Sequence, residues 1–237
     1  MASLTGRAPA QIHELASAVK GWLSAAEGDL LYTLARQCTS ACIVEIGSYQ
    51  GKSTTFLAAG SEAGSRVPVY AIDPHSGSKA SPEGVEGVER QIARAGLSHL
   101  VRPIVSPSTD AAPGFHEPIE FLFIDGNHQL RAVTEDWDMW VHKVIPGGYV
   151  ALHDTVLWSG PSEIAETRLL RSGDFVDTGL ADSITFGRKR RHSEPKESRL
   201  HTLRVRALKR TCNVAVRIPL PPAAKHVASR VLSLLQK

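Results

Sequence analysis

The sequence predicts an α/β fold built on a doubly wound, mostly parallel sheet of seven strands. Three observations favour this fold. Short apolar runs rich in β-branched residues alternate with stretches whose apolar residues recur at helical spacing. The last two runs are separated by a short turn, which suits an antiparallel hairpin. The chain has 237 residues, of which 42% are hydrophobic, and this is enough for one large domain with appendages.

The elements are expected in a regular order. Residues 10–37 should form helices, because Ile12, Leu15 and Val19 recur at helical spacing. Strands are expected at 42–46, 67–72, 100–105, 119–124 and 149–153, and helices at 51–62, 83–96 and 130–142. The segments 175–179 and 183–187 should then close the sheet as a hairpin. Because strand and helix alternate, successive strands should run parallel, as in a Rossmann-like sheet.

Charge divides the chain into two parts. Residues 188–237 carry 14 Lys or Arg and 2 Asp or Glu, whereas residues 1–187 carry 13 basic and 22 acidic residues. We therefore expect three regions: N-terminal helices at 1–40, a core at 41–187, and a basic C-terminal extension at 188–237.

Composition also limits the class of protein. No apolar run approaches the roughly 18 residues that a membrane span requires, and the first residues lack the apolar stretch of a secretory signal. Cys38, Cys42 and Cys212 are an odd number without regular spacing, which favours buried reduced thiols over disulfides or a metal site. These features predict a cytoplasmic protein without a transmembrane segment.

The stretch EIGSYQGKST at 45–54 has two interpretations. It ends in Gly-Lys-Ser, as a phosphate-binding P-loop does, but that motif requires a glycine five residues before Gly51. Ile46 stands there and Gly47 comes one position later, so a nucleotide-hydrolysing site is not favoured. The second interpretation is a tight glycine turn that lets the backbone approach a cofactor closely. The next strand ends in Asp73, an acid that could bind ribose hydroxyls.

Polar residues follow the predicted strands at their carboxyl ends. They are Glu45, Gly47, Asp73, Ser106, Ser108, Asp125, His153 and Asp154. Ligands of doubly wound sheets bind at this edge. Helix caps and turns use the same residue types, but their occurrence at five strand ends favours a binding site.

Further stretches resemble the motifs of a known family. FIDGNH at 123–128 and PGGYVALHDTVLW at 146–158 resemble motifs of the divalent-metal-dependent small-molecule O-methyltransferases, such as the catechol, caffeoyl-CoA and macrolide-sugar enzymes. VEIGSYQG at 44–51 resembles the first motif of the class I methyltransferases that use S-adenosylmethionine (SAM). AEGDLLYTLA at 26–35 is similar to a helix start of the caffeoyl-CoA enzymes. The resemblance covers residues 25–187 and leaves the basic extension outside.

The resemblance implies which residues bind SAM. They are Glu45, Gly47, Tyr49, Gly51, Ser53, Asp73, Ser108, Asp125 and Gly126. Asp73 is expected to accept hydrogen bonds from the ribose hydroxyls, and Ser108 is expected near adenine. SAM carries no phosphate, so Lys52 needs no anion.

The resemblance also implies a catalytic group. Asp125 and Asp154 stand where the resembling enzymes hold a divalent cation, and Mg²⁺ suits two carboxylates completed by water and substrate oxygens. The third ligand of those enzymes is Asn or Asp, where this chain has Thr155, a weak ligand. His128 stands at the position of the base that removes the hydroxyl proton, with Asp125 beside it in the catalytic group. His153 is the second candidate for that base.

The implied activity is transfer of a methyl group from SAM to a hydroxyl of a small acceptor. The similarity of IDGN and HDT to the macrolide-sugar enzymes favours a sugar or a glycosylated metabolite. Asn127 and His153 are alternative donors for the third ligand position. The other functions considered are a nucleic-acid methyltransferase that uses the basic extension and a SAM-binding protein without catalysis.

The basic extension leaves several interpretations open. Residues 188–199 are polar, as in a linker, and 200–218 has the pattern of an amphipathic helix or strand. Residues 223–237 have apolar side chains at helical spacing. The extension could join subunits into a homodimer or larger homo-oligomer or form a lid, could bind an acidic substrate or a membrane surface, or could contact RNA. RNA is not favoured, because the extension lacks interleaved aromatic residues.

Overall fold

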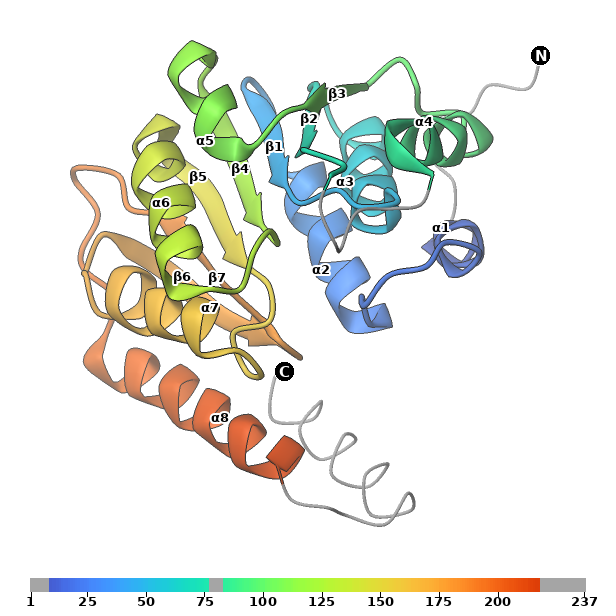
Figure 1. Cartoon of the computed structure of the whole chain (residues 1–237). Helices are drawn as coiled ribbons and strands as arrows, with labels where there is room; N and C mark the ends of the chain where they lie inside the picture. Colours follow the sequence, from blue (N-terminus) through green and yellow to red (C-terminus); the bar gives the residue numbers. More distant parts are fainter. Residues whose placement is uncertain (1–8, 77–82, 218–237) are drawn as a thin grey trace.

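The computed structural model describes residues 9–76 and 83–217 and contains the predicted sheet. Its strands lie in the order β3-β2-β1-β4-β5-β7-β6 (Figure 1). The strands β1 to β5 are parallel to one another, and β7 pairs antiparallel with both β5 and β6. The prediction of a seven-stranded, mostly parallel sheet that closes with a hairpin is therefore confirmed.

The strands correspond to the predicted runs. They are β1 (Cys42–Ile46), β2 (Val69–Asp73), β3 (Val101–Val105), β4 (Ile119–Ile124), β5 (Val144–Leu152), β6 (Phe175–Ala181) and β7 (Ile184–Lys189). In β1, Val44 is paired with Tyr70 on one side and with Leu122 on the other. All residues of β1 are buried, because a central parallel strand is covered on both faces.

Strand β5 begins earlier than the sequence predicts. Val144 already pairs with Ile119, and the pairing resumes at Tyr149 opposite Phe121. The turn expected at Pro146-Gly-Gly148 is therefore an irregularity inside the strand.

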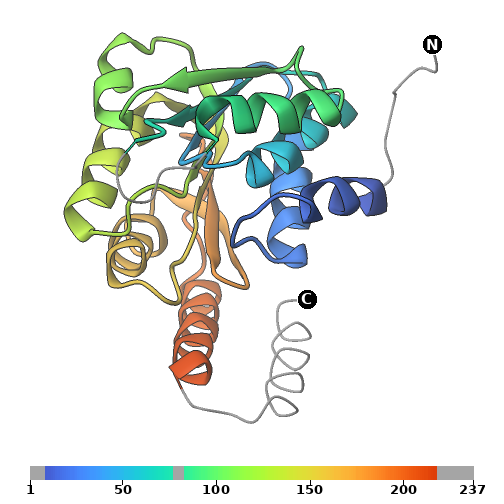
Figure 2. The same cartoon turned by 45° about the vertical axis from the view of Figure 1, so that its right-hand side comes forward.

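Helices cover both faces of the sheet (Figures 1 and 2). One face carries α1 (Pro9–Ser17), α2 (Ala25–Arg36), α3 (Lys52–Ala63) and α4 (Gly84–Arg94), and the other carries α5 (Ser108–Ala111), α6 (Leu130–Trp140) and α7 (Ser159–Ile164). Neighbouring residues of β1 serve opposite cores: Ile43 belongs to the core that contains Leu57, and Val44 to the core that contains Trp140. The sheet is thus held between two apolar layers.

The short helix α5 and the helical segment between β5 and β6 were not predicted from the sequence. Helix α7 continues into a π-helical turn, η3 (Ala165–Leu170). Gly160-Pro161 is a turn signal in sequence, but Pro161 falls in the first turn of α7, where the missing N–H costs nothing. Ile164 and Leu169 then pack into the second core.

The basic extension begins with a helix that packs on its own chain. Helix α8 (Arg199–Arg217) contacts β6 and η3. Its inward face buries Val205 and Cys212, and the buried Lys209 donates from Nζ to the Ser162 carbonyl at 3.1 Å. The amphipathic pattern is therefore helical. The expected segment 223–237 lies outside the described residues.

The polar stretch before α8 is anchored by ion pairs. Arg188 lies 2.7 Å from Asp177 and 3.0 Å from Glu194. Glu194 also accepts a hydrogen bond from the Arg191 backbone N–H at 2.9 Å. These contacts hold the stretch against the hairpin that it follows.

The cysteines are free and buried, as predicted. Burial raises the pKa of Cys42 to about 12, so its thiol stays protonated at neutral pH. In the part of the chain that the structure describes, no helix has the length and the hydropathy that a membrane span needs.

Candidate active site

The carboxyl ends of the parallel strands bring polar residues to one edge of the sheet, as predicted. Gly47 follows β1, Asp73 ends β2, Asp125 follows β4 and His153 follows β5. The backbone joins these ends directly: the Gly47 N–H donates to Ile72 at 2.8 Å, and the His153 N–H donates to the carbonyl at the end of β4 at 3.0 Å. The edge is therefore continuous from β2 to β5.

Gly47 lets the first turn lie against the end of β4. Its φ is 93°, and a Cβ there would lie 2.2 Å from the carbonyl oxygen of Asp125. A side chain would therefore push the two loops apart. Gly51 begins α3 with a φ of 82°, and Tyr49 between them also has a positive φ of 46°. The loop is the tight turn that the sequence predicts.

Asp73 lies beside this turn. Its Oδ2 accepts a hydrogen bond from the Tyr49 N–H at 2.9 Å, and its Oδ1 accepts one from the His75 N–H at 2.7 Å. These two bonds fix the carboxylate against the glycine turn. Each carboxylate oxygen has a second acceptor position for a ligand hydroxyl.

Glu45 is buried beneath the turn. The Thr54 hydroxyl donates to its Oε2, and its Oε1 has no hydrogen-bond partner among the described residues. Burial raises the pKa of Glu45 to about 8, against the opposing effect of hydrogen bonds from Ser53 and Thr54. An unpartnered buried oxygen is a place where a ligand donor can bind.

Ser108 and Gly126 lie around a common neighbour, Asp136 of α6. The Ser108 hydroxyl donates to Asp136, whose pKa burial raises to about 6. A Cβ on Gly126 would lie 3.4 Å from Asp136 Oδ2 and 3.4 Å from Ile46 Cγ2. The loops after β3 and β4 are thus tied together beside the turn.

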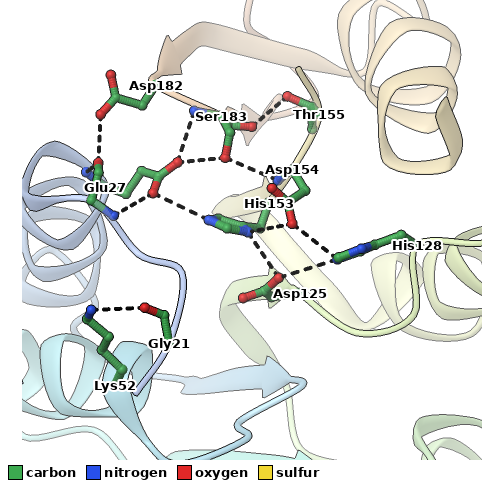
Figure 3. A network of polar contacts seen from close by, with 11 residues as sticks. Gly21, Glu27, Lys52, Asp125, His128, His153, Asp154, Thr155, Asp182 and Ser183 are labelled. Carbon is green, nitrogen blue, oxygen red and sulfur yellow. Dashed lines mark hydrogen bonds and ion pairs between the residues drawn. The ribbon is translucent and has the colours of Figure 1, made fainter. Parts of the chain in front are cut away.

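An acid–imidazole group lies where β4 and β5 end (Figure 3). It consists of Asp125, His128 and Asp154, and one ligand atom from each lies within 4.8 Å of the others. His128 Nε2 is 3.2 Å from Asp154 Oδ2 and 4.0 Å from Asp125 Oδ1. Asp154 has a φ of 57°, a turn conformation that Asp tolerates better than most residues. The group is half-buried, so it is open to a ligand.

His153 differs from His128 in its surroundings. It is 3% exposed, and its Nδ1 lies 3.1 Å from Asp125 Oδ1 and 3.4 Å from Asp154 Oδ2. Its Nε2 lies 3.4 Å from Oε2 of Glu27 in α2. Burial lowers the pKa of His153, but the three carboxylates outweigh burial and raise it to about 12. Its ring nitrogens make no aligned hydrogen bond, so the attraction is chiefly ionic, and the raised pKa favours the protonated ring.

Thr155 lies outside the acid–imidazole group. Its hydroxyl donates to the Ser183 carbonyl at 2.7 Å and is 2.6 Å from the Thr185 hydroxyl. Asn127, the alternative donor, accepts a hydrogen bond from the Gln129 N–H at 3.0 Å and is exposed. Neither side chain therefore supplies a third oxygen to Asp125 and Asp154 in this arrangement.

Glu27 also belongs to this site, although its sequence pattern predicts only a helix cap. Ser24-x-x-Glu27 has the pattern of a capping box, and both capping bonds are present at the start of α2. Glu27 is nevertheless buried beside His153. Burial alone would raise its pKa, but contacts with His153, Ser183 and Ser24 outweigh burial and lower the pKa to about 2. The capping pattern explains a glutamate at this position by itself, so the sequence gives no sign of its contacts with Ser183 and His153.

Trp158 covers one side of His128. The two rings have centroids 4.9 Å apart and planes inclined by 38°. Gly160 lets α7 begin against the backbone of the same loop, because a Cβ there would lie 2.3 Å from the His128 carbonyl oxygen. The start of α7, which was not predicted from the sequence, thus packs closely against the loop that carries His128.

Part of the chain is similar to proteins of known family. Residues 44–155 match the family described as a methyltransferase domain. The human transmembrane O-methyltransferase is 29% identical over 139 residues, which are 56% of this chain and 45% of that protein. A catechol O-methyltransferase from Mycobacterium tuberculosis is 27% identical, over 58% of each chain. The chain therefore spans about half the length of the curated relatives that it matches.

Solved structures share the fold. The O-methyltransferase TomG from Streptomyces achromogenes, solved with SAM and involved in tomaymycin synthesis, has a TM-score of 0.57 at 21% identity, over 79% of this chain and 92% of that one. The shared sheet places the turn after β1 and the acids after β2, β4 and β5 at one edge. Over residues 44–155 the chain therefore resembles the class I SAM-dependent methyltransferases of the catechol and caffeoyl-CoA O-methyltransferase type, and it shares the fold of TomG.

Proposed function

We propose that the protein is a SAM-dependent O-methyltransferase that methylates a hydroxyl group of a small molecule. The observation that carries this proposal is that the acid–imidazole group lies on the same sheet edge as the glycine turn and Asp73. The methyl group of SAM is already electrophilic. The protein therefore has two tasks, to align the acceptor with the methyl group and to remove the hydroxyl proton.

The cofactor is assigned to the edge between β1 and β4. Asp73 would accept hydrogen bonds from the ribose hydroxyls through the free positions of its two oxygens. The tight turn at Gly47 would let the backbone lie against the methionine part. The unpartnered Oε1 of Glu45 supports a polar contact there, and Ser108 with Gly126 would lie toward adenine.

The base is assigned to His128. Its ring is 20% exposed and faces Asp154, which would stabilise the imidazolium that forms when the proton is taken. His153 is a poor candidate, because its side chain is 3% exposed and three carboxylates raise its pKa to about 12. The choice between the two histidines therefore rests on burial and on charge.

Asp125 and Asp154 are the residues that would hold a divalent cation. Mg²⁺ is commonly bound through one or two carboxylates, with water and substrate filling its other positions, and these two carboxylates converge with His128 inside 4.8 Å. Thr155 and Asn127 are engaged elsewhere, so this group offers two carboxylate ligands among the described residues rather than the three oxygen ligands expected. The ion, when bound, would lower the pKa of a coordinated acceptor hydroxyl.

A sugar or a glycosylated metabolite is proposed as the acceptor, on the similarity of the IDGN and HDT motifs to the macrolide-sugar enzymes. Trp158 supports an acceptor with a flat face, because it is 48% exposed and lies beside the proposed base. A homodimer or larger homo-oligomer also remains a proposal. Helix α8 exposes Leu200, Leu203 and Val214 away from the residues that pack on its own chain, which supports a second interface there.

Calorimetry with SAM and an acceptor screen test the proposed function. Asp73→Ala should abolish SAM binding, and wild-type affinity in this variant would contradict the cofactor assignment. Labelled SAM offered with glycosides, phenols and RNA should transfer its label to a hydroxyl of a small molecule. Turnover should fall in EDTA and return with Mg²⁺ if the two carboxylates hold the ion. Label found only in RNA would favour the nucleic-acid alternative.

A further inference from the structure

We infer that Glu27 is a positioning residue of the active site: through His153 and Ser183 it sets the arrangement of Asp125 and Asp154. This inference rests on the proposed function. Glu27 belongs to α2, on the first face of the sheet, and contacts neither Asp125 nor Asp154 in the network of Figure 3. Its influence has to pass through the side chains that connect it to them.

The first connection runs through His153. Glu27 Oε2 lies 3.4 Å from one ring nitrogen, and the other ring nitrogen lies 3.1 Å from Asp125 and 3.4 Å from Asp154. A buried imidazole ring is held in place where polar groups face both of its ring nitrogens. Without Glu27, the ring would keep carboxylates on one side only and could turn or shift toward them. Asp125 and Asp154 would then lose a fixed neighbour.

The second connection runs through the turn between β6 and β7. Glu27 Oε1 accepts hydrogen bonds from the Ser183 N–H at 2.9 Å and from its hydroxyl at 2.6 Å. The same hydroxyl oxygen accepts a hydrogen bond from the Asp154 N–H at 3.3 Å, and the Ser183 carbonyl accepts one from the Thr155 N–H at 3.0 Å. The turn thus holds the backbone on which the Asp154 carboxylate stands.

A third contact closes the network on α2. Ser24, the capping residue, donates from its hydroxyl to Asp182 at 2.6 Å, and its N–H donates to Glu27 Oε2 at 2.8 Å. The start of α2 is therefore bound to the hairpin turn at two points. Glu27 joins the helix, the turn and the histidine. A neutral side chain of the same size should therefore make the positions of Asp125 and Asp154 less fixed while the fold persists.

Glu27→Gln tests this inference, with Glu120→Gln as the matched control. Glu120 is also a carboxylate that ties a loop: it accepts hydrogen bonds from the backbone N–H groups of Thr39, Ser40 and Ala41 at 2.8 to 3.0 Å. It lies near the start of β4, at the opposite end of the sheet from the site. Both variants should lose stability, but only one should lose turnover.

Glu27→Gln should lower kcat by about 10- to 100-fold, the usual effect of removing a residue that orients the groups touching the substrate. The Kd for SAM should stay within about twofold of wild type on calorimetry, and Glu120→Gln should keep kcat within the same range. Ser183→Ala, a milder change, should lower kcat about two- to tenfold through the lost hydroxyl contacts. Wild-type kcat in Glu27→Gln, or an equal fall in both glutamine variants, would overturn the inference.

A second readout separates this inference from the proposed function. Imidazole NMR signals should move for His153 in Glu27→Gln and stay in place in Glu120→Gln, whether or not an acceptor has been found. Unchanged His153 signals in a folded Glu27→Gln would overturn the inference while leaving the methyltransferase activity open. Absence of methyl transfer in the wild type, with the His153 signals shifted in the variant, would contradict the proposed function alone.

Discussion

His128 and His153 lie on the same sheet edge and contact the same two aspartates, but their side chains differ in burial. His128 is 20% exposed and has Asp154 at 3.2 Å. His153 is 3% exposed and lies within 3.4 Å of three carboxylates, on both sides of its ring. The same side chain is thus suited to move a proton at one position and to hold one at the other.

Different burial and different neighbouring carboxylates thus suit two identical residues to different roles. A base must be reached by the acceptor and must be able to release its proton again. A structural cation must instead be enclosed by acids that make its deprotonation costly. Sequence position alone leaves both histidines as candidates, whereas burial and the third acid, Glu27, distinguish them.

Removing the proposed base should have the largest effect on turnover. His128→Ala should lower kcat by about 10² to 10⁴, the usual contribution of a general base. SAM binding should persist, because Asp73 and the glycine turn are untouched. Single-turnover assays with labelled SAM and calorimetry measure the two quantities. A variant that keeps the wild-type rate would move the base elsewhere and remove the contrast between the histidines.

His153→Asn should affect stability more than His128→Ala does. It leaves Glu27, Asp125 and Asp154 facing one another without a buried counter-charge, and breaking a buried pair costs about 3 to 5 kcal/mol. Urea unfolding of both variants measures the difference. If Glu27 acts through His153, the double variant that combines His153→Asn with Glu27→Gln should have nearly the same kcat as His153→Asn alone. Additive losses would argue for independent roles.

A smaller effect should appear in the pH dependence of stability. The pKa of Glu27 is lowered to about 2 from 4.5, so its contribution is present above about pH 4.5 and is lost as the pH falls toward 2. The pKa of His153 is raised from 6.5 to about 12, so its contribution is present below about pH 6.5 and declines as the pH rises. The stability advantage of the wild type over Glu27→Gln should therefore be greatest between these values.

Urea unfolding of the wild type and Glu27→Gln at about pH 3, 5.5 and 9 measures this advantage. A difference that stays constant across the series would mean that the Glu27 carboxylate and the His153 cation do not stabilise each other.

The sequence predicts the fold well because its signals are local. Runs such as Cys42–Ile46 and Ile119–Ile124 are bounded by glycine or an acid, and their alternation with helices determines the parallel order. Gly47 could be placed in a close turn, because a glycine after a first strand has a specific steric reason. The edge of the sheet and most of its acids follow from this pattern.

The contacts between distant segments were not predictable. Glu27 has a complete local explanation as a helix cap, and Ser183 is an ordinary turn residue, yet they meet beside His153. Thr155 is directed away from the two aspartates by its hydrogen bonds with Ser183 and Thr185, which belong to a later hairpin. Such contacts depend on tertiary packing, which periodicity and spacing do not encode.

The protonation of His153 is the most direct test of the account. Selective ¹⁵N labelling of histidine, with His153→Asn to assign the signals, reports whether each ring nitrogen carries a proton. At about pH 9, where a free imidazole is neutral, both nitrogens of His153 should still be protonated. A neutral His153 at that pH would contradict the account, because this residue would then be as able as His128 to accept the proton of the acceptor.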